Sequence, residues 1–143
     1  MRSRLLAFAV LALLGVAPAA AETIASPPKG TPLRSEVLNA LRPMVEKETG
    51  GAVIFVVHAL NVMGEWAYVD ADPRRPNGDK VDWRKTKFRR DFEADMFSGL
   101  VLALLRKQGG SWKVVELAMG PTDVAWIEWA KQYKLPNDLF KGP

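Results

Sequence analysis

The chain has no cysteine and only one histidine, and each absence limits what it can do. Without cysteine it can form no disulfide, offers no thiol nucleophile and cannot carry a lipid on a lipobox cysteine. With His58 alone, neither a histidine metal cluster nor a pair of acid–base histidines can be built. No glycine-rich phosphate loop follows an expected strand, and we expect no cofactor. Stability must therefore come from apolar burial, to which five Trp and six Phe contribute.

The first 21 residues are typical of an export signal. Arg2 and Arg4 precede a short apolar run at 5–17, and Ala19-Ala20-Ala21 supplies the small residues of a signal peptidase site. The run is shorter than the ~20 apolar residues that usually span a bilayer. We therefore expect cleavage after Ala21, a periplasmic or secreted protein, and no membrane span after cleavage. An uncleaved N-terminal anchor is the alternative.

Net charge gives little information about partners. It is +4 for the whole chain and falls to +2 when Arg2 and Arg4 leave with the signal. The basic and aromatic run at 83–90 is typical of proteins that bind single-stranded nucleic acid. However, Asp91 and two further carboxylates follow it at once, and the protein is expected to be exported. We expect no nucleic acid partner.

Residues 22–30 lack apolar periodicity and contain Pro27-Pro28, so they are expected to form a flexible leader to a single domain at 31–143. Thr31 and Pro32 indicate a helix start, as N-cap and first helical residue. Apolar residues then recur at three- and four-residue spacing from 33 to 45. Pro43 should kink or restart this helix. Gly50 is expected to end it in a left-handed conformation.

Two hairpins are expected after the helix. Residues 52–60 are mostly β-branched and aromatic, which indicates a strand, central in the sheet and covered on both faces. After a turn at 61–64, residues 65–71 return with alternating faces. Gly109-Gly110 lies between two apolar runs and supplies the positive φ angles of a second tight reversal.

The stretch between the hairpins, Asp72 to Asp95, holds eight Lys or Arg and six Asp or Glu. A connection of this length is either functional or loosely ordered. Part of it, 84–92, could extend the flanking strands. Its carboxylates fit no EF-hand pattern and have basic neighbours, so we expect salt links on a solvated loop and no metal site.

The order of elements predicts the α+β class. Hairpin-linked strands are antiparallel, and the apolar stripe of the helix must be buried against one face of their sheet. We expect an N-terminal helix packed on a curved antiparallel sheet of four or more strands, made of two hairpins. A C-terminal helix at 123–133 completes the domain, with Thr122 or Asp123 as its cap.

Aromatic residues near the last helix suggest a binding site. The proposed ligand-binding residues are Trp66, Trp112, Trp126, Trp129 and Tyr133. In the functional interpretation, Asp123 stands at the mouth of a pocket lined by Trp126, Trp129 and Tyr133. In the structural interpretation, Asp123 caps a helix and the aromatics form its core-facing stripe, which is the commoner arrangement.

The candidates for catalysis are Glu116, Asp123, His58 and Tyr68. Glu116 interrupts an apolar strand and either faces solvent or lines the same cavity. His58 lies inside an expected central strand, which favours a packed ring with one hydrogen bond. A catalytic base needs a positioned partner, and the sequence does not supply one.

The segments 64–69, 102–106, 110–115 and 120–126, taken together, are similar to small uncharacterised exported bacterial proteins. The resemblance spans about residues 32–140 and consists of Gly, Trp and apolar scaffold positions. It implies a fold related to the cystatin-like or nuclear transport factor 2-like group, in which a curved antiparallel sheet wraps a helix. It implies no catalytic residues, and the chain differs from the transport-factor type by its C-terminal helix.

Three functions follow as hypotheses. The first is a non-enzymatic exported domain that binds a small apolar ligand or a periplasmic partner protein. The second is a cofactor-free enzyme that uses a carboxylate in the sheet cavity. The third is an assembly module that forms homodimers through an exposed sheet face. Fold analogy supports enzyme and binder equally.

Overall fold

The computed structural model describes residues 22–143, so the expected export signal and its cleavage site lie outside the described residues. The helices are α1 (Pro32–Thr49), α2 (Arg89–Glu93) and α3 (Trp126–Tyr133), with short 3-10 turns η1 (Trp83–Lys85) and η2 (Asn137–Phe140). The strands are β1 (Ile54–Met63), β2 (Trp66–Arg74), β3 (Val101–Gln108) and β4 (Ser111–Met119). Within 22–143, no helix is both long and apolar enough to cross a membrane.

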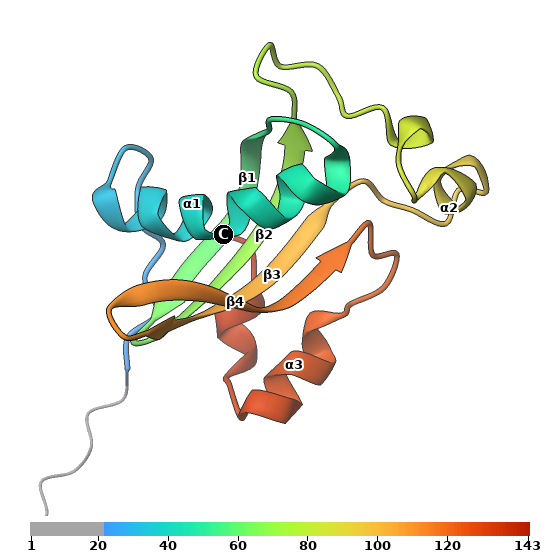
Figure 1. Cartoon of the computed structure of the whole chain (residues 1–143). Coiled ribbons are helices and arrows are strands. Elements are labelled where there is room, and N and C mark those ends of the chain that lie inside the picture. The colour runs from blue at the N-terminus through green and yellow to red at the C-terminus, as the bar shows by residue number, and fades with distance from the viewer. Residues whose placement is uncertain (1–21) are drawn as a thin grey trace, which may run out of the picture.

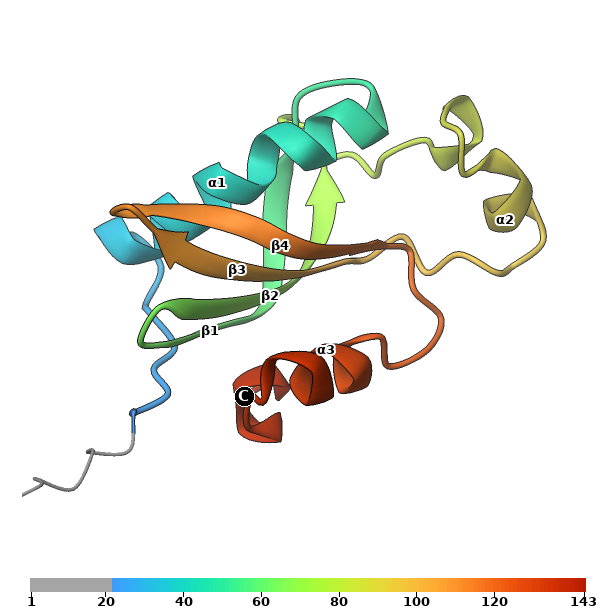
Figure 2. The same ribbon diagram turned by 60° about the horizontal axis from the view of Figure 1, so that its bottom comes forward.

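The four strands form one antiparallel sheet in the order β1-β2-β3-β4, which confirms the α+β class and the two hairpins. Helix α1 lies on one face of the sheet, while α3 and the C-terminal turn lie on the other (Figures 1 and 2). The chain between β2 and β3 extends past one end of the sheet and carries α2 (Figure 2). The sheet therefore separates two apolar layers, and a third region projects beyond it.

Helix α1 forms largely as its sequence predicts. Pro32 occupies the first turn, where no N–H is missed, and the helix continues through Pro43 without interruption. Gly50 closes it at φ 75°, with its N–H bonded to the carbonyl of Glu46. Thr31 is the N-cap residue, as predicted, although its hydroxyl donates to Pro28 O and makes no side-chain cap bond.

The alternation of β2 determines which layer each side chain joins. Ala67, Val69 and Ala71 pack with α1 in one buried cluster, whereas Tyr68 belongs to the cluster beneath α3. All four are nearly fully buried. The predicted two-residue period is confirmed here, because β2 is a central strand with a helix over each face.

Strand β1 is an edge strand, and its predicted central position is wrong. Among the four strands it pairs with β2 alone, and Ile54 and Val56 are 41% and 46% exposed. A β-bulge between Val57 and Ala59 leaves His58 exposed, so the expected packed ring is also wrong. Composition favoured a strand correctly, but burial depends on which neighbours the topology supplies.

The segment expected to be a flexible leader contacts the sheet. Ala25 pairs with Val62 through two backbone hydrogen bonds of 2.8 and 2.9 Å. The hydroxyl of Ser26 donates to Asn61 Oδ1 at 2.6 Å, and Pro27 is buried. Residues 25–27 are thus held against the far end of β1 instead of lying free.

Helix α3 begins later than predicted. It starts at Trp126, with Ala125 in the cap position and no side-chain cap bond. Thr122 and Asp123 are exposed in the preceding bend, so neither caps the helix as expected. Leu139 and Phe140 of the following η2 turn are buried beneath the sheet and complete this layer.

Candidate functional site

The five aromatic residues proposed to bind a ligand are divided by the sheet. Trp112 is buried in the α1 layer, and the other four belong to the α3 layer. Trp112 and Glu116 are four residues apart and would share one face of a regular strand, but a β-bulge in β4 opposite Leu104–Leu105 places them on opposite faces of the sheet. The five side chains therefore do not line one pocket, although Trp126, Trp129 and Tyr133 belong to the same layer.

The four aromatics of the α3 layer fill the space between helix and sheet. The rings of Trp126 and Phe140 stack with centroids 5.4 Å apart, and those of Trp66 and Tyr133 lie 5.1 Å apart. Trp129 is buried against the sheet. This arrangement matches the structural interpretation of the stripe, in which aromatic area stabilises the fold.

The four candidates for catalysis do not converge. The hydroxyl of Tyr133 donates to Glu116 Oε1 at 2.8 Å, and this bond raises the pKa of Tyr133. Asp123 and His58 are exposed on separate elements. Tyr68 is buried, and burial, reinforced by the charge of Asp70, raises the pKa of its phenol.

Asp70 is a titratable residue that the sequence interpretation passed over. It lies on β2 on the same face as Tyr68, and its Oδ1 atom is buried without a hydrogen-bond partner. Burial raises the pKa of this carboxyl, an effect that the nearby charge of His58 partly offsets. The two-residue period of β2 places Asp70 on the face that carries Trp66 and Tyr68. This alternation is the sequence signal that could have identified Asp70.

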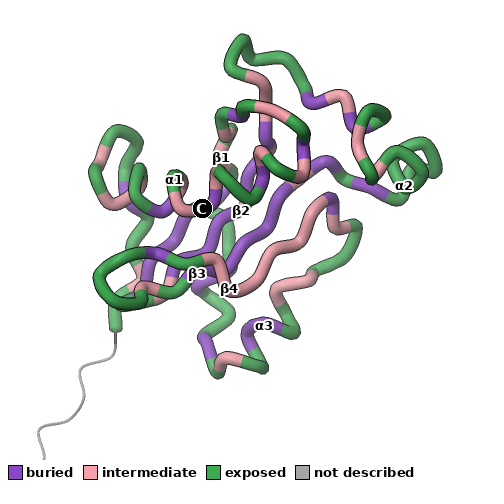
Figure 3. The backbone as a smooth tube through the Cα atoms, viewed as in Figure 1, coloured by how far each residue is buried: buried purple, intermediate pink, exposed green. Residues whose placement is uncertain are grey.

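The charged stretch between β2 and β3 has its own small hydrophobic core. Val81, Trp83 and Phe97 are buried together, with Phe88 packed against them. The ring of Phe97 lies 4.8 Å from both Trp83 and Phe88. An ion pair between Lys87 and Glu48 joins the stretch to α1. The region is an ordered structure, although most of α2 and its flanks is exposed (Figure 3).

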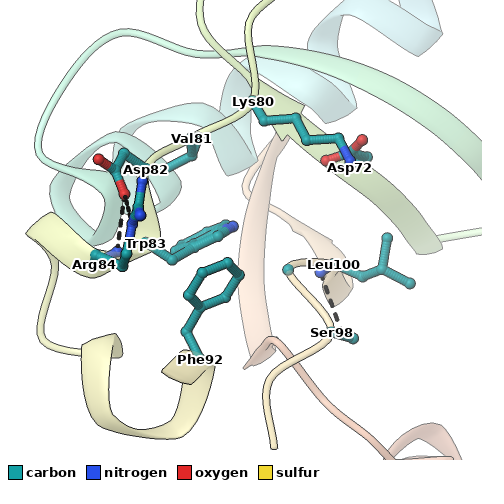
Figure 4. Close-up of a pocket in the computed structure, with 10 residues that line it drawn as sticks. Asp72, Lys80, Val81, Asp82, Trp83, Arg84, Phe92, Ser98 and Leu100 are labelled. Carbon is teal, nitrogen blue, oxygen red and sulfur yellow. Dashed lines mark hydrogen bonds and ion pairs between the residues drawn. The ribbon is translucent and has the colours of Figure 1, made fainter. Parts of the chain in front are cut away.

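Residues 84–92 do not extend the strands as expected. Asp82 Oδ1 accepts a hydrogen bond from the backbone N–H of Arg84 and starts the η1 turn. The chain then enters α2, which places Phe92 beside Trp83 (Figure 4). Local side-chain bonding to the backbone competes with strand pairing, and here it prevails.

A cleft of about 530 Å³ lies between this region and the end of the sheet (Figure 4). Its apolar wall is formed by Val81, Trp83, Phe92 and Leu100. Phe92 is 37% exposed, which is unusual for so large an apolar side chain. Gly99 has a φ of 77°, and a Cβ there would lie 3.1 Å from the indole nitrogen of Trp83. Glycine therefore permits the loop backbone to approach the indole closely.

The polar wall consists of Asp72, Lys80, Asp82 and Arg84. Arg84 pairs with Asp82 at 2.9 Å, and this bond lowers the pKa of the Asp82 carboxyl. Arg74 pairs with Asp72 at 2.7 Å. The side chain of Lys80 extends over the cleft toward Asp72 (Figure 4), yet it forms no ion pair with any described residue. Lys80 is thus the cation of the lining whose charge is not neutralised by a bonded carboxylate.

The sequence interpretation missed the residues of this cleft. Lys80, Trp83, Phe92 and Leu100 come from four different local structures. They meet only through the small core of Val81, Trp83 and Phe97, the third core of the protein. The basic and aromatic run at 83–90 is the available signal, but its pattern is typical of nucleic-acid binding and does not indicate a cleft. Within residues 22–143, no cluster of three or more His, Asp or Glu side chains could hold a metal ion.

Comparisons with protein-family models, with curated proteins and with solved structures found no match to this chain. The resemblance to small exported bacterial proteins therefore stays a prediction. The function must be argued from the geometry of the cleft itself.

Proposed function

We propose that the protein is an exported binding domain without enzymatic activity, which holds a small amphipathic anion in the cleft between the end of the sheet and the 80–100 region. The observation that carries the proposal is the cleft itself, with an apolar wall on one side and, on the other, Lys80, which forms no ion pair within residues 22–143. Export rests on the N-terminal sequence pattern alone.

The size and wall of the cleft support a small organic ligand. A volume of about 530 Å³ falls within the range of small-molecule sites, roughly 300 to 1,000 Å³. Phe92 and Leu100 present apolar surface to solvent, and a ligand that covers this surface gains about 25 cal/mol for each Å² buried. The apolar body of the ligand would therefore contact Trp83 and Phe92.

The charges of the cleft favour an anionic group at one end of the ligand. Asp72 and Asp82 are each bonded to an arginine, so their charges are largely compensated. Lys80 has no such partner in the described part of the chain and can approach a carboxylate, sulfonate or phosphate without breaking an existing pair. Lys acts at such sites as a flexible point charge, which gives modest selectivity.

One observation favours a second function, a cofactor-free enzyme. The pKa of Asp70 is raised by burial, and perturbed carboxyls occur often in active sites. Two of the groups first suggested for catalysis, His58 and Tyr68, lie near Asp70, but Glu116 and Asp123 do not influence it and the cleft is not lined by Asp70. The binding function therefore has the stronger support.

Titration of the 22–143 chain with the fluorescent amphipathic anion anilinonaphthalene sulfonate tests the proposal. We expect saturable binding of one molecule. Phe92→Ala should weaken it about tenfold, which corresponds to ~1.4 kcal/mol. Met96→Ala is the matched control, because Met96 is 67% exposed nearby but does not line the cleft.

A charge variant tests the role of Lys80 separately. Lys80→Gln should weaken binding about threefold, as exposed ion pairs contribute roughly 0.2–1 kcal/mol. Lys85→Gln, at an exposed η1 residue that does not line the cleft, should leave the affinity unchanged. If neither Phe92→Ala nor Lys80→Gln changes the affinity, or if binding does not saturate, the cleft is ruled out as the site.

A further inference from the structure

The outer edge of β1 carries unpaired backbone groups. In an antiparallel pair, alternate residues direct their N–H and C=O toward the partner strand and away from it. Val62 directs both outward, since they bond to Ala25. Nearer the start of the strand, Phe55 lies opposite Pro73, which has no N–H and therefore fits a pair without hydrogen bonds. The backbone groups of Phe55 and Val57 thus face outward too.

A groove of about 490 Å³ runs beside this edge. One side is β1 from Ile54 to Val57, and the other is formed by Arg34 and Leu38 of α1 with Lys29 and Gly30 before it. Ile54 and Val56 are 41% and 46% exposed on the opposite face of the strand. An extended segment lying along the edge would cover apolar side chains on both faces of β1.

The chain itself places an extended segment on this edge. Residues around Ala25 lie antiparallel to β1 and exchange two backbone hydrogen bonds with Val62. This contact stops before the bulge at His58, so the edge beyond it is uncovered in the described structure. The same backbone chemistry is therefore available to a second segment at Phe55 and Val57.

The charges along the groove determine what kind of segment fits. Lys29 and Arg34 line it, and no carboxylate does. The guanidinium of Arg42 lies 5.3 Å from the ring centroid of Phe55, close behind the edge. Two copies of this chain that paired through β1 would bring these cations together, whereas an acidic segment would neutralise them.

We propose that the β1 edge binds an extended acidic peptide of a partner protein, which adds to the sheet as a fifth strand. Its main chain bonds to the outward N–H and C=O groups of Phe55 and Val57, and its carboxylates lie near Lys29 and Arg34. Main-chain bonds supply affinity in such strand addition, and side chains at alternate positions supply selectivity. This surface is separate from the ligand cleft, so either proposal can fail alone.

The test uses the 22–143 chain and a synthetic acetylated peptide of alternating Val and Asp. Amide hydrogen exchange is followed by NMR. We expect the peptide to slow exchange at Phe55 and Val57 at least about tenfold, the factor that corresponds to ~1.4 kcal/mol of protection. A peptide of alternating Val and Lys should leave both amides unchanged. Equal protection by both peptides, or none by either, overturns the proposal.

Two further measurements keep the outcome decisive. Lys29→Glu should weaken the acidic peptide about threefold or more, while Lys131→Glu on α3 should not. Lys29 makes no side-chain bond to another described residue, so this substitution leaves the fold intact. Protection of Phe55 and Val57 that rises with protein concentration in the absence of peptide would show a second copy on the edge and would overturn the acidic-partner proposal.

Discussion

The α3 layer and the 72–100 region differ in whether their apolar side chains fill the space around them. The α3 layer is rich in aromatics, and its rings fill the space that they enclose. The 72–100 region is rich in charge, yet its three-residue core holds a loop at a distance from the sheet and leaves a cleft. The many apolar side chains of the α3 layer thus fill the space around them. The few apolar side chains of the 72–100 region order the loop but leave a cleft beside it.

The difference shows why aromatic content alone is a poor guide to a binding site. Trp126 and Trp129 have partners within reach on η2 and the sheet, so they reduce their exposure by packing. Phe92 lies on a five-residue helix with few neighbours and stays partly exposed. A binding wall arises where an element is too short to bury its own apolar side chain.

The largest expected effect tests whether the α3 layer is structural. Trp129→Ala should lower the free energy of unfolding by about 3–5 kcal/mol, because it leaves a cavity in a buried cluster. Urea denaturation measures the change. Ile127→Ala on the exposed side of the same helix is the control and should cost far less. A loss below about 1 kcal/mol for Trp129→Ala would contradict a core role.

A glycine substitution tests how closely the core of Val81, Trp83 and Phe97 is packed. Gly120 has a φ of 61°, and a Cβ there would lie 2.1 Å from the ring of Phe97. Gly120→Ala should therefore cost about 2–4 kcal/mol, from backbone strain together with overpacking, and should weaken binding of anilinonaphthalene sulfonate. Gly78→Ala also has a positive φ but no atom within 4 Å, so it should cost only about 1–2 kcal/mol and spare the cleft.

The bond between Tyr133 and Glu116 gives a smaller, pH-dependent effect. Tyr133→Phe should cost about 1 kcal/mol near neutral pH. Because the folded-state pKa of Tyr133 lies above its ordinary value of 10.0, this contribution is present below pH 10 and is lost as the pH rises through the folded value. Urea midpoints of the two proteins should therefore approach each other only in strong alkali. A constant difference at all pH values would show that the hydroxyl is not involved.

Asp70→Asn should have the smallest effect and the opposite sign. The folded-state pKa of Asp70 is raised, so stability from its protonated form is present below the ordinary value of 3.8 and is lost as the pH rises through the folded value. At pH 7 the ionised carboxylate opposes folding, and the variant should be slightly more stable than the natural protein. The gain should vanish below pH 3.8. A loss of stability at pH 7 would mean that Asp70 has a stabilising partner.

Much of the fold could be predicted because local signals agree with it. Pro32 and Gly50 mark the ends of α1, the Gly109-Gly110 pair marks a hairpin, and the alternation of β2 assigns its faces. Each of these depends on backbone geometry within a few residues. Such features survive any tertiary arrangement that uses the same elements.

The errors concern features that depend on distant neighbours. The β-branched run of β1 gives no information on whether a strand lies beyond it, so its edge position was missed. The cleft was missed for the same reason. Trp83 and Leu100 are adjacent only because the ring of Phe97 packs edge-on against the indole and Gly99 allows the backbone to approach. Neither contact follows from a helix or strand periodicity of the sequence.

The indole N–H signals of the five tryptophans give the most direct test of the contrast between the two regions. The NMR experiment is a titration of the isotope-labelled 22–143 chain with anilinonaphthalene sulfonate. We predict that the signal of Trp83 shifts with saturation, while those of Trp126 and Trp129 stay in place. Shifts at Trp126 and Trp129 with Trp83 unmoved would contradict the account and place the ligand in the α3 layer.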